Sequence, residues 1–202
     1  MPIGVVLEVS GSGAQVAFDL QRITECIEDD DPSIALAGQV GSQIKIRVGD
    51  AWLLANVRDQ RKDRRTEGGV IANLDFLGEG SEEKLTSRIH GFKRCVTRYP
   101  VPGAMVYPAT TGDLRQIYAS DGRANITIGK VFPTKDIRAG LYIDAMLGKH
   151  FALLGSTGTG KSTSAALILH RICETAPKGH VVMIDPHGEY AAAFRTTGRI
   201  LD

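Results

Sequence analysis

Eight residues, Gly155 to Ser162, constrain the fold of this chain more than any other feature of its sequence. They read GSTGTGKS and fit the pattern GxxxxGK[ST], in which a glycine-rich turn leads into a Lys-Ser pair. A short apolar run at 150–154 precedes the motif, an apolar helix pattern at 163–176 follows it, and a second apolar run occupies 181–184. This order predicts strand, helix and strand, with the two strands in a buried parallel sheet.

The residue types of the motif suit the binding of nucleotide phosphates. Gly155, Gly158 and Gly160 allow backbone conformations that bring successive N–H groups around one anion. The helix that begins near Lys161 directs its unsatisfied N–H groups and the positive end of its dipole toward the same anion. A strand-to-helix turn without a ligand needs no Lys-Ser pair after three glycines, so we predict a phosphate site.

Side chains of the motif complete this predicted site. Lys161 is expected to reach the β- and γ-phosphates and to act in catalysis as charge develops on the γ-phosphate. The Ser162 hydroxyl is expected to bind Mg²⁺, which prefers oxygen ligands. Thr159 and Thr163 add phosphate contacts. The full predicted nucleotide-binding set is Gly155, Ser156, Thr157, Gly158, Thr159, Gly160, Lys161, Ser162 and Thr163.

The run DPHGEY at 185–190, directly after the second apolar run, leaves two interpretations open. In the first, Asp185 binds Mg²⁺ and Glu189 faces the γ-phosphate as a catalytic carboxylate. In the second, Asp185 is the N-cap of a helix that has Pro186 at its first position. His187 is expected to be a hydrogen-bonded loop residue.

The first hundred residues carry a different pattern, in which short apolar runs alternate with turns. Several short strands at this spacing predict a small β-barrel. We therefore expect an α+β chain with a barrel at 1–95, a turn-rich connector at 96–145 and the start of a P-loop α/β domain at 146–202. The expected barrel strands are Ile3–Val9, Ala14–Phe18, Gln43–Val48, Ala51–Val57 and Gly69–Leu77.

Composition excludes several classes of protein. A hydrophobic content of 43% supports a buried core, and 24 Lys+Arg against 23 Asp+Glu exclude a global polycation. The sequence has no run of 18 apolar residues and no secretory signal pattern, so we expect a cytoplasmic protein without a membrane segment. Cys26, Cys95 and Cys173 lack the spacing of a zinc site and are expected to be free thiols.

Two charged stretches have more than one interpretation. The acidic stretch from Glu25 to Asp31 is expected to be a solvated loop. Five basic residues lie between Lys84 and Arg98 without one carboxylate. This basic window could contact a nucleic-acid backbone, face an acidic partner or be a solvated surface.

Two longer runs resemble the HerA branch of the HerA/FtsK ATPases. They are LGKHFALLGSTGTGKSTSAALILHRI at 147–172 and VVMIDPHGEYAAAF at 181–194. The resemblance implies a RecA-like ATPase domain after an N-terminal barrel like that of rotary ATP synthase subunits. It also implies a hexameric motor that uses ATP and Mg²⁺ to move double-stranded DNA and works with a partner nuclease.

The resemblance also bears on what these 202 residues do alone. HerA proteins run to several hundred residues, and their water-activating Glu and inter-subunit arginine lie beyond the second strand. We therefore expect an ATPase when the protein is full length, whereas residues 1–202 alone bind ATP poorly and do not hydrolyse it. The alternative function is a ring-shaped scaffold that assembles and regulates an antiviral defence effector, recruited through the barrel, without processive translocation.

Overall fold

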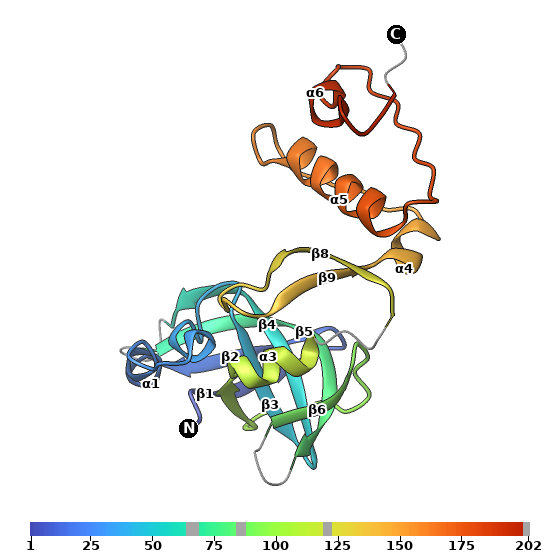
Figure 1. The fold of residues 1–202 in the computed structure, drawn as a ribbon. Helices are drawn as coiled ribbons and strands as arrows, with labels where there is room; N and C mark the ends of the chain where they lie inside the picture. The colour runs from blue at the N-terminus through green and yellow to red at the C-terminus, as the bar shows by residue number, and fades with distance from the viewer. Residues whose placement is uncertain (64–68, 84–87, 119–122, 200–202) are drawn as a thin grey trace. The chain divides into compact units, whose positions relative to one another are not determined.

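A computed structural model describes residues 1–63, 69–83, 88–118 and 123–199 of the chain (Figure 1). The described residues form two compact units. The first contains residues up to 118 together with 131–137, and the second contains 123–130 together with 138–199. Each unit has a hydrophobic core of its own.

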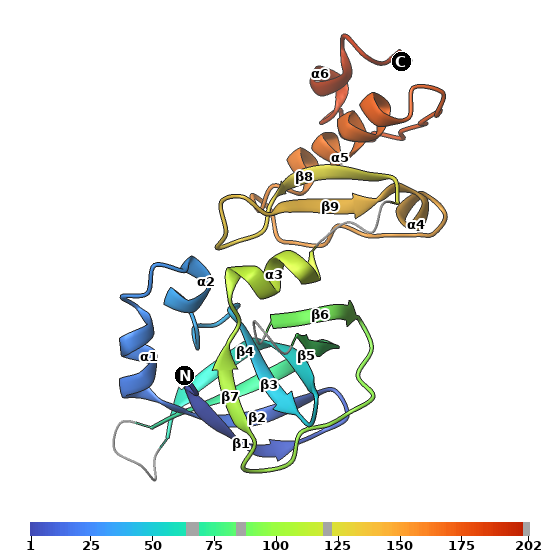
Figure 2. The same cartoon turned by 60° about the horizontal axis from the view of Figure 1, so that its bottom comes forward.

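The first unit is built on a closed antiparallel barrel of six strands, as the sequence predicts. Hydrogen bonding runs in the order β2-β1-β7-β3-β4-β5, and β5 pairs with β2 to close the circle (Figure 2). Closure leaves these strands without an open edge. A further strand, β6, continues the sheet beyond the second half of β5. The bounds are β1 Gly4–Val9, β2 Gly13–Asp19, β3 Gln43–Val48, β4 Ala51–Lys62, β5 Gly69–Glu83, β6 Arg88–Lys93 and β7 Met105–Pro108.

Alternating side chains fill the barrel. Ile44 and Ile46 of β3 and Leu53 of β4 are almost completely buried in its core. The sixth strand, β7, comes from the segment expected to connect the two domains, and it pairs with both β1 and β3. The barrel therefore extends past residue 95.

Helix α3, Thr111–Ile117, packs against β6 and shares a hydrophobic cluster with Trp52 and Leu54 of β4. A capping box begins this helix, in which Thr110 and Asp113 bond each other's backbone N–H. The Asp113 carboxylate is fully buried and lies 2.8 Å from Lys45 Nζ of β3. It also accepts the backbone N–H of Ile89 in β6 at 2.9 Å. One carboxylate thus joins α3 to two strands.

Two further helices, α1 (Leu20–Cys26) and α2 (Pro32–Ala35), lie between β2 and β3. The acidic stretch expected to be a solvated loop falls here, and its last residue has a structural role. Asp31 caps α2 by accepting the N–H of Ser33 at 2.9 Å, and it accepts the N–H of Thr111 at 2.8 Å. Asp31 therefore holds the first turns of α2 and α3 together.

In its described residues, the second unit consists of a two-stranded sheet and three helices. Helix α5 packs against β8, and Ile126, Ile143, Ile168 and Ile172 form the core between them. None of the helices in the described ranges is both long and apolar enough to cross a lipid bilayer. The elements are β8 Asn125–Lys130, β9 Arg138–Tyr142, α4 Ile143–Leu147, α5 Lys161–Thr175 and α6 Ala191–Phe194.

The predicted helix of the βαβ unit is confirmed, whereas its two buried strands are not formed. Residues 150–154 and 181–184 pair with no strand in the described parts of the chain. Their side chains are largely exposed, with Leu154 and Val182 each at 91%. Apolar composition favours burial, but a parallel strand also needs hydrogen-bonded neighbours along its edges. Without such neighbours these runs form no strand and remain exposed.

Candidate nucleotide-binding site

The loop between residues 154 and 161 contains three glycines, and a side chain at any of them would be sterically unfavourable. Gly158 and Gly160 have φ angles of +83° and +85°, which L-residues with a side chain rarely adopt. A Cβ on Gly155 would lie 2.5 Å from Thr159 Oγ1, closer than any real contact. A side chain at Gly158 or Gly160 would therefore strain the backbone, and one at Gly155 would require Thr159 to move.

Three groups of the loop converge on the carbonyl oxygen of Ser156. Lys161 Nζ donates to this oxygen at 2.8 Å, Thr159 Oγ1 donates to it at the same distance, and the Thr159 backbone N–H donates to it at 3.4 Å. The long Lys161 side chain thus folds back over the loop, although it starts in the first helical turn. The bond to Ser156 holds the Lys161 ammonium group against the loop backbone, so the loop carries a positive charge.

The N-terminus of α5 opens into the same loop. Its N-cap is Gly160, and no described side chain caps this end of the helix. The first helical hydrogen bond runs from the N–H of Ser164 to the carbonyl of Gly160, at 2.8 Å. The N–H groups before it have no intrahelical acceptor, and the helix dipole adds positive potential there. A helix end of this kind favours an anion such as phosphate.

Glu189 approaches this helix end from a loop that is distant in sequence. The Ser162 hydroxyl in the first turn of α5 donates a hydrogen bond to Glu189 Oε2. The structure therefore places Glu189, from the run at 185–190, beside Ser162 of the Lys-Ser pair in the glycine motif. A hydroxyl and a carboxylate side by side offer hard oxygen atoms of the kind that Mg²⁺ prefers.

Asp185 lies in the loop that leads to Glu189, and its carboxylate accepts two backbone N–H groups of that loop. Its Oδ1 accepts the N–H of Glu189 at 3.1 Å, and its Oδ2 accepts the N–H of Tyr190 at 2.9 Å. The N-cap expectation is wrong, because the next helix, α6, begins only at Ala191 and has Tyr190 as its N-cap. Through these two bonds Asp185 instead closes the short loop 185–190, which carries Glu189.

The remaining candidate residues have simple surroundings. Thr157 and Thr163 are exposed beside the loop. Across the described residues, no three His, Cys, Asp or Glu side chains form a group that could hold a metal ion. Cys26 is buried, whereas Cys95 and Cys173 are exposed, and all three are free thiols. Burial raises the pKa of the Cys26 thiol, and the nearby Asp29 charge raises it further.

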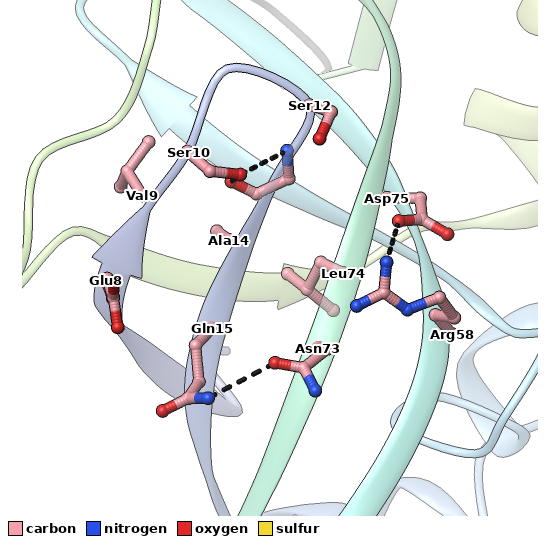
Figure 3. Close-up of a pocket in the computed structure, with 11 residues that line it drawn as sticks. Glu8, Val9, Ser10, Ser12, Ala14, Gln15, Arg58, Asn73, Leu74 and Asp75 are labelled. Carbon is pink, nitrogen blue, oxygen red and sulfur yellow. Dashed lines mark hydrogen bonds and ion pairs between the residues drawn. The ribbon is translucent and has the colours of Figure 1, made fainter.

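The barrel has a shallow polar hollow of its own, lined by the hairpin of β1 and β2 and by β4 and β5 (Figure 3). Arg58 of β4 pairs with Asp75 of the neighbouring strand β5 at 2.9 Å, and Gln15 of β2 donates to Asn73 of β5 at 3.2 Å. These four polar side chains of the hollow thus bond one another in pairs. It contains none of the residues of the glycine loop, so it is not part of the candidate nucleotide site.

The basic window is only partly described. Lys84 lies outside the described residues, and Arg98 forms ion pairs with Asp50 and Glu79. Glu79 also accepts the Thr97 hydroxyl at 2.6 Å and the backbone N–H groups of Thr97 and Arg98. These bonds, the Thr97 hydroxyl first, lower the pKa of Glu79. Arg98 is thus engaged within the barrel unit.

Comparison with known proteins adds to this geometry. Residues 126–202 match the family model described as "Helicase HerA, central domain". The DNA double-strand break repair helicase HerA of Pyrococcus furiosus is 34% identical over 144 residues, which cover 69% of this chain and 25% of that protein. A probable HerA of Methanocaldococcus jannaschii is 32% identical over 156 residues, covering 74% of this chain and 29% of that protein. The chain is a HerA-like member of the HerA/FtsK superfamily.

The family match begins earlier than the glycine loop. It starts at Ile126 and so includes β8 and β9, which pack under α5 in the same compact unit. Both strands lie in the segment 96–145, which the sequence predicts as a connector that leads into the P-loop domain. The HerA-like chain spans about a quarter of the length of these curated relatives.

Proposed function

We propose that this HerA-like chain is the ATP-binding subunit of a DNA translocase or helicase. The observation that carries the proposal is the meeting of Lys161, the uncapped N-terminus of α5 and the Ser162–Glu189 pair around one glycine loop. Positive charge and free N–H groups suit a triphosphate, and adjacent oxygens suit its metal ion.

The residues present fit ATP with Mg²⁺. The amides of residues 155–160 and of the first turn of α5 bind the phosphates, and Lys161 exchanges its bond to Ser156 for the β- and γ-phosphates. Ser162 holds the metal ion, which neutralises phosphate charge when bound. Thr159 and Thr163 contribute hydroxyl contacts.

Glu189 and Asp185 take different parts in this proposal. We assign Glu189, next to Ser162, as the carboxylate that faces the metal and the γ-phosphate. Asp185 fits a metal ligand less well, since each of its two oxygens already accepts a backbone N–H. Its part is to shape the loop that carries Glu189.

The assembled protein is proposed to be a hexameric ring that moves double-stranded DNA in the cytoplasm. The relatives named as DNA double-strand break repair helicases support action on DNA. The closed barrel is proposed to recruit a partner nuclease or defence effector. Because residues 150–154 and 181–184 are exposed apolar runs beside the site, we propose that residues 1–202 alone do not turn over ATP.

Hydrolysis of ATP by the full-length protein, with and without duplex DNA, tests this proposal. Duplex DNA is expected to raise the rate, and Lys161→Ala is expected to abolish it. Lys178→Ala, at an exposed lysine after α5, is the matched control and keeps the wild-type rate. Hydrolysis indifferent to DNA would contradict translocation. If hydrolysis is indifferent to DNA but nucleotide binding controls the activity of a co-purified partner, the ring-shaped scaffold replaces the translocase as the proposed function.

A further inference from the structure

Glu189 lies on a loop that forms no strand or helix, so the anchors of this loop decide where its carboxylate lies. Asp185 closes the loop internally through the N–H groups of Glu189 and Tyr190. Those bonds fix the shape of the loop but do not attach it to α5. The short helix α6 follows directly, and its four residues lack a side-chain cap. Apart from the bond between Ser162 and Glu189, attachment to α5 must therefore come from contacts of α6.

His170 of α5 makes such contacts. Its ring stacks on Phe194 of α6, with centroids 4.5 Å apart and planes 19° from parallel. Its Nε2 lies 3.0 Å from the carbonyl oxygen of Ala193. Ring stacking and a hydrogen bond together fix both the orientation and the height of α6 along the helix.

The same helix carries Ser162, eight residues before His170. At 1.5 Å per residue the two positions are about 12 Å apart along the axis. The segment from Glu189 to Phe194 is thus attached to α5 at both ends, through Ser162 and through His170. Because one continuous helix carries both attachment points, their separation does not change when the loop moves.

We propose that His170 is a positioning residue that sets the place of Glu189 at the Ser162 hydroxyl. The inference rests on the proposed function, in which Glu189 faces the metal and the γ-phosphate. His170 touches neither of them and acts only through α6 and the loop. Loss of its ring frees the loop end, and a displacement of about 1 Å in a reacting group can lower turnover about 100-fold.

Turnover of the full-length protein with Mg²⁺ and ATP tests this inference. His170→Ala is expected to lower kcat about 10- to 100-fold with little change in the KM for ATP, and to raise the Mg²⁺ concentration needed for half-maximal rate. His170→Gln retains a hydrogen-bond donor and is expected to recover part of the loss. His180→Ala, at an exposed histidine of the same unit, is the matched control and keeps the wild-type rate.

A double-mutant cycle separates positioning from a general structural effect. If His170 acts through Glu189, the double variant His170→Ala with Glu189→Gln has the kcat of Glu189→Gln alone. Amide hydrogen exchange of the nucleotide-free protein gives a readout apart from activity, and residues 189–194 are expected to lose protection in His170→Ala. Should that variant fail to fold, Phe194→Leu removes the same stack from the other side.

The outcomes distinguish this inference from the proposed function. The positioning role is overturned if the kcat losses multiply in the double variant, or if His170→Ala keeps the wild-type kcat. Full turnover in Glu189→Gln would overturn the role proposed for Glu189 itself, and the positioning role with it. Full turnover in Lys161→Ala would instead overturn the nucleotide site itself.

Discussion

Replacement of Asp113 by alanine is predicted to destabilise the barrel unit more than replacement of an exposed residue in the same unit. The carboxylate is fully buried, and it accepts from Lys45 Nζ at 2.8 Å and from the Ile89 N–H at 2.9 Å. It also accepts the N–H and the hydroxyl of Thr110, both at 2.9 Å. All of these bonds are lost together in Asp113→Ala.

The magnitude follows from those partners. Removal of one member of a buried ion pair costs about 3–5 kcal/mol. A buried N–H left without its acceptor costs about 1–3 kcal/mol. The N-cap bond from the residue 113 N–H to the Thr110 hydroxyl is kept in the variant. Since one carboxylate makes all of the lost bonds, the terms are not additive, and we take roughly 4 kcal/mol for the total. This is a large part of the roughly 5–15 kcal/mol that stabilises a typical protein.

Urea unfolding followed by tryptophan fluorescence measures this loss. The chain has one tryptophan, Trp52, which is 4% exposed, with its ring centroid 4.6 Å from Lys45 Nζ. With a slope of about 2 kcal/mol per M, the midpoint is expected to fall by about 2 M. Asp136→Asn, which breaks the exposed pair with Arg115, is expected to leave the midpoint unchanged. An unchanged midpoint in Asp113→Ala would refute the reasoning.

Two further predictions follow from shifted pKa values. Bonds from Thr97 lower the pKa of Glu79 below its ordinary 4.5, so this carboxylate stabilises the fold fully above that pH and loses the contribution as the pH falls through the lowered pKa. Urea midpoints below pH 4.5 are expected to fall less steeply in Glu79→Gln, and parallel curves would contradict this. Burial raises the pKa of Cys26, so a thiol reagent at pH 8 is expected to modify two cysteines quickly and Cys26 slowly, whereas three equal rates would contradict its burial.

The barrel is largely predictable from sequence because alternation reports which side of a strand is buried. The runs at 43–48 and 51–57 pair in the expected hairpin. Strand β7 is not predictable in this way, since it has four residues and ends in Pro108. Lys45 also defeats the pattern, because its outward position on β3 is covered by α3, a helix more than sixty residues later.

In the candidate site too, contacts between residues near in sequence are predictable, and contacts between distant residues are not. The glycine loop and the start of α5 depend on neighbouring residues, so their motif predicts them. The bond from Ser162 to Glu189 joins residues 27 positions apart, and no local pattern encodes it. The Thr110–Asp113 capping box is a local signal and is present in the sequence as Thr-x-x-Asp. The expectation of a turn-rich connector at 96–145 therefore overlooks α3.

The central claim is that the glycine loop, Lys161 and Ser162 form one site for Mg²⁺ and nucleotide. Titration of the full-length protein with a fluorescent ATP analogue, with and without Mg²⁺, tests it most directly. Mg²⁺ is expected to tighten binding to the wild type, Ser162→Ala to lose this effect, and Lys161→Ala to bind at least about tenfold more weakly, a loss of about 1.4 kcal/mol. Equal affinities for the wild type and Lys161→Ala would contradict the account.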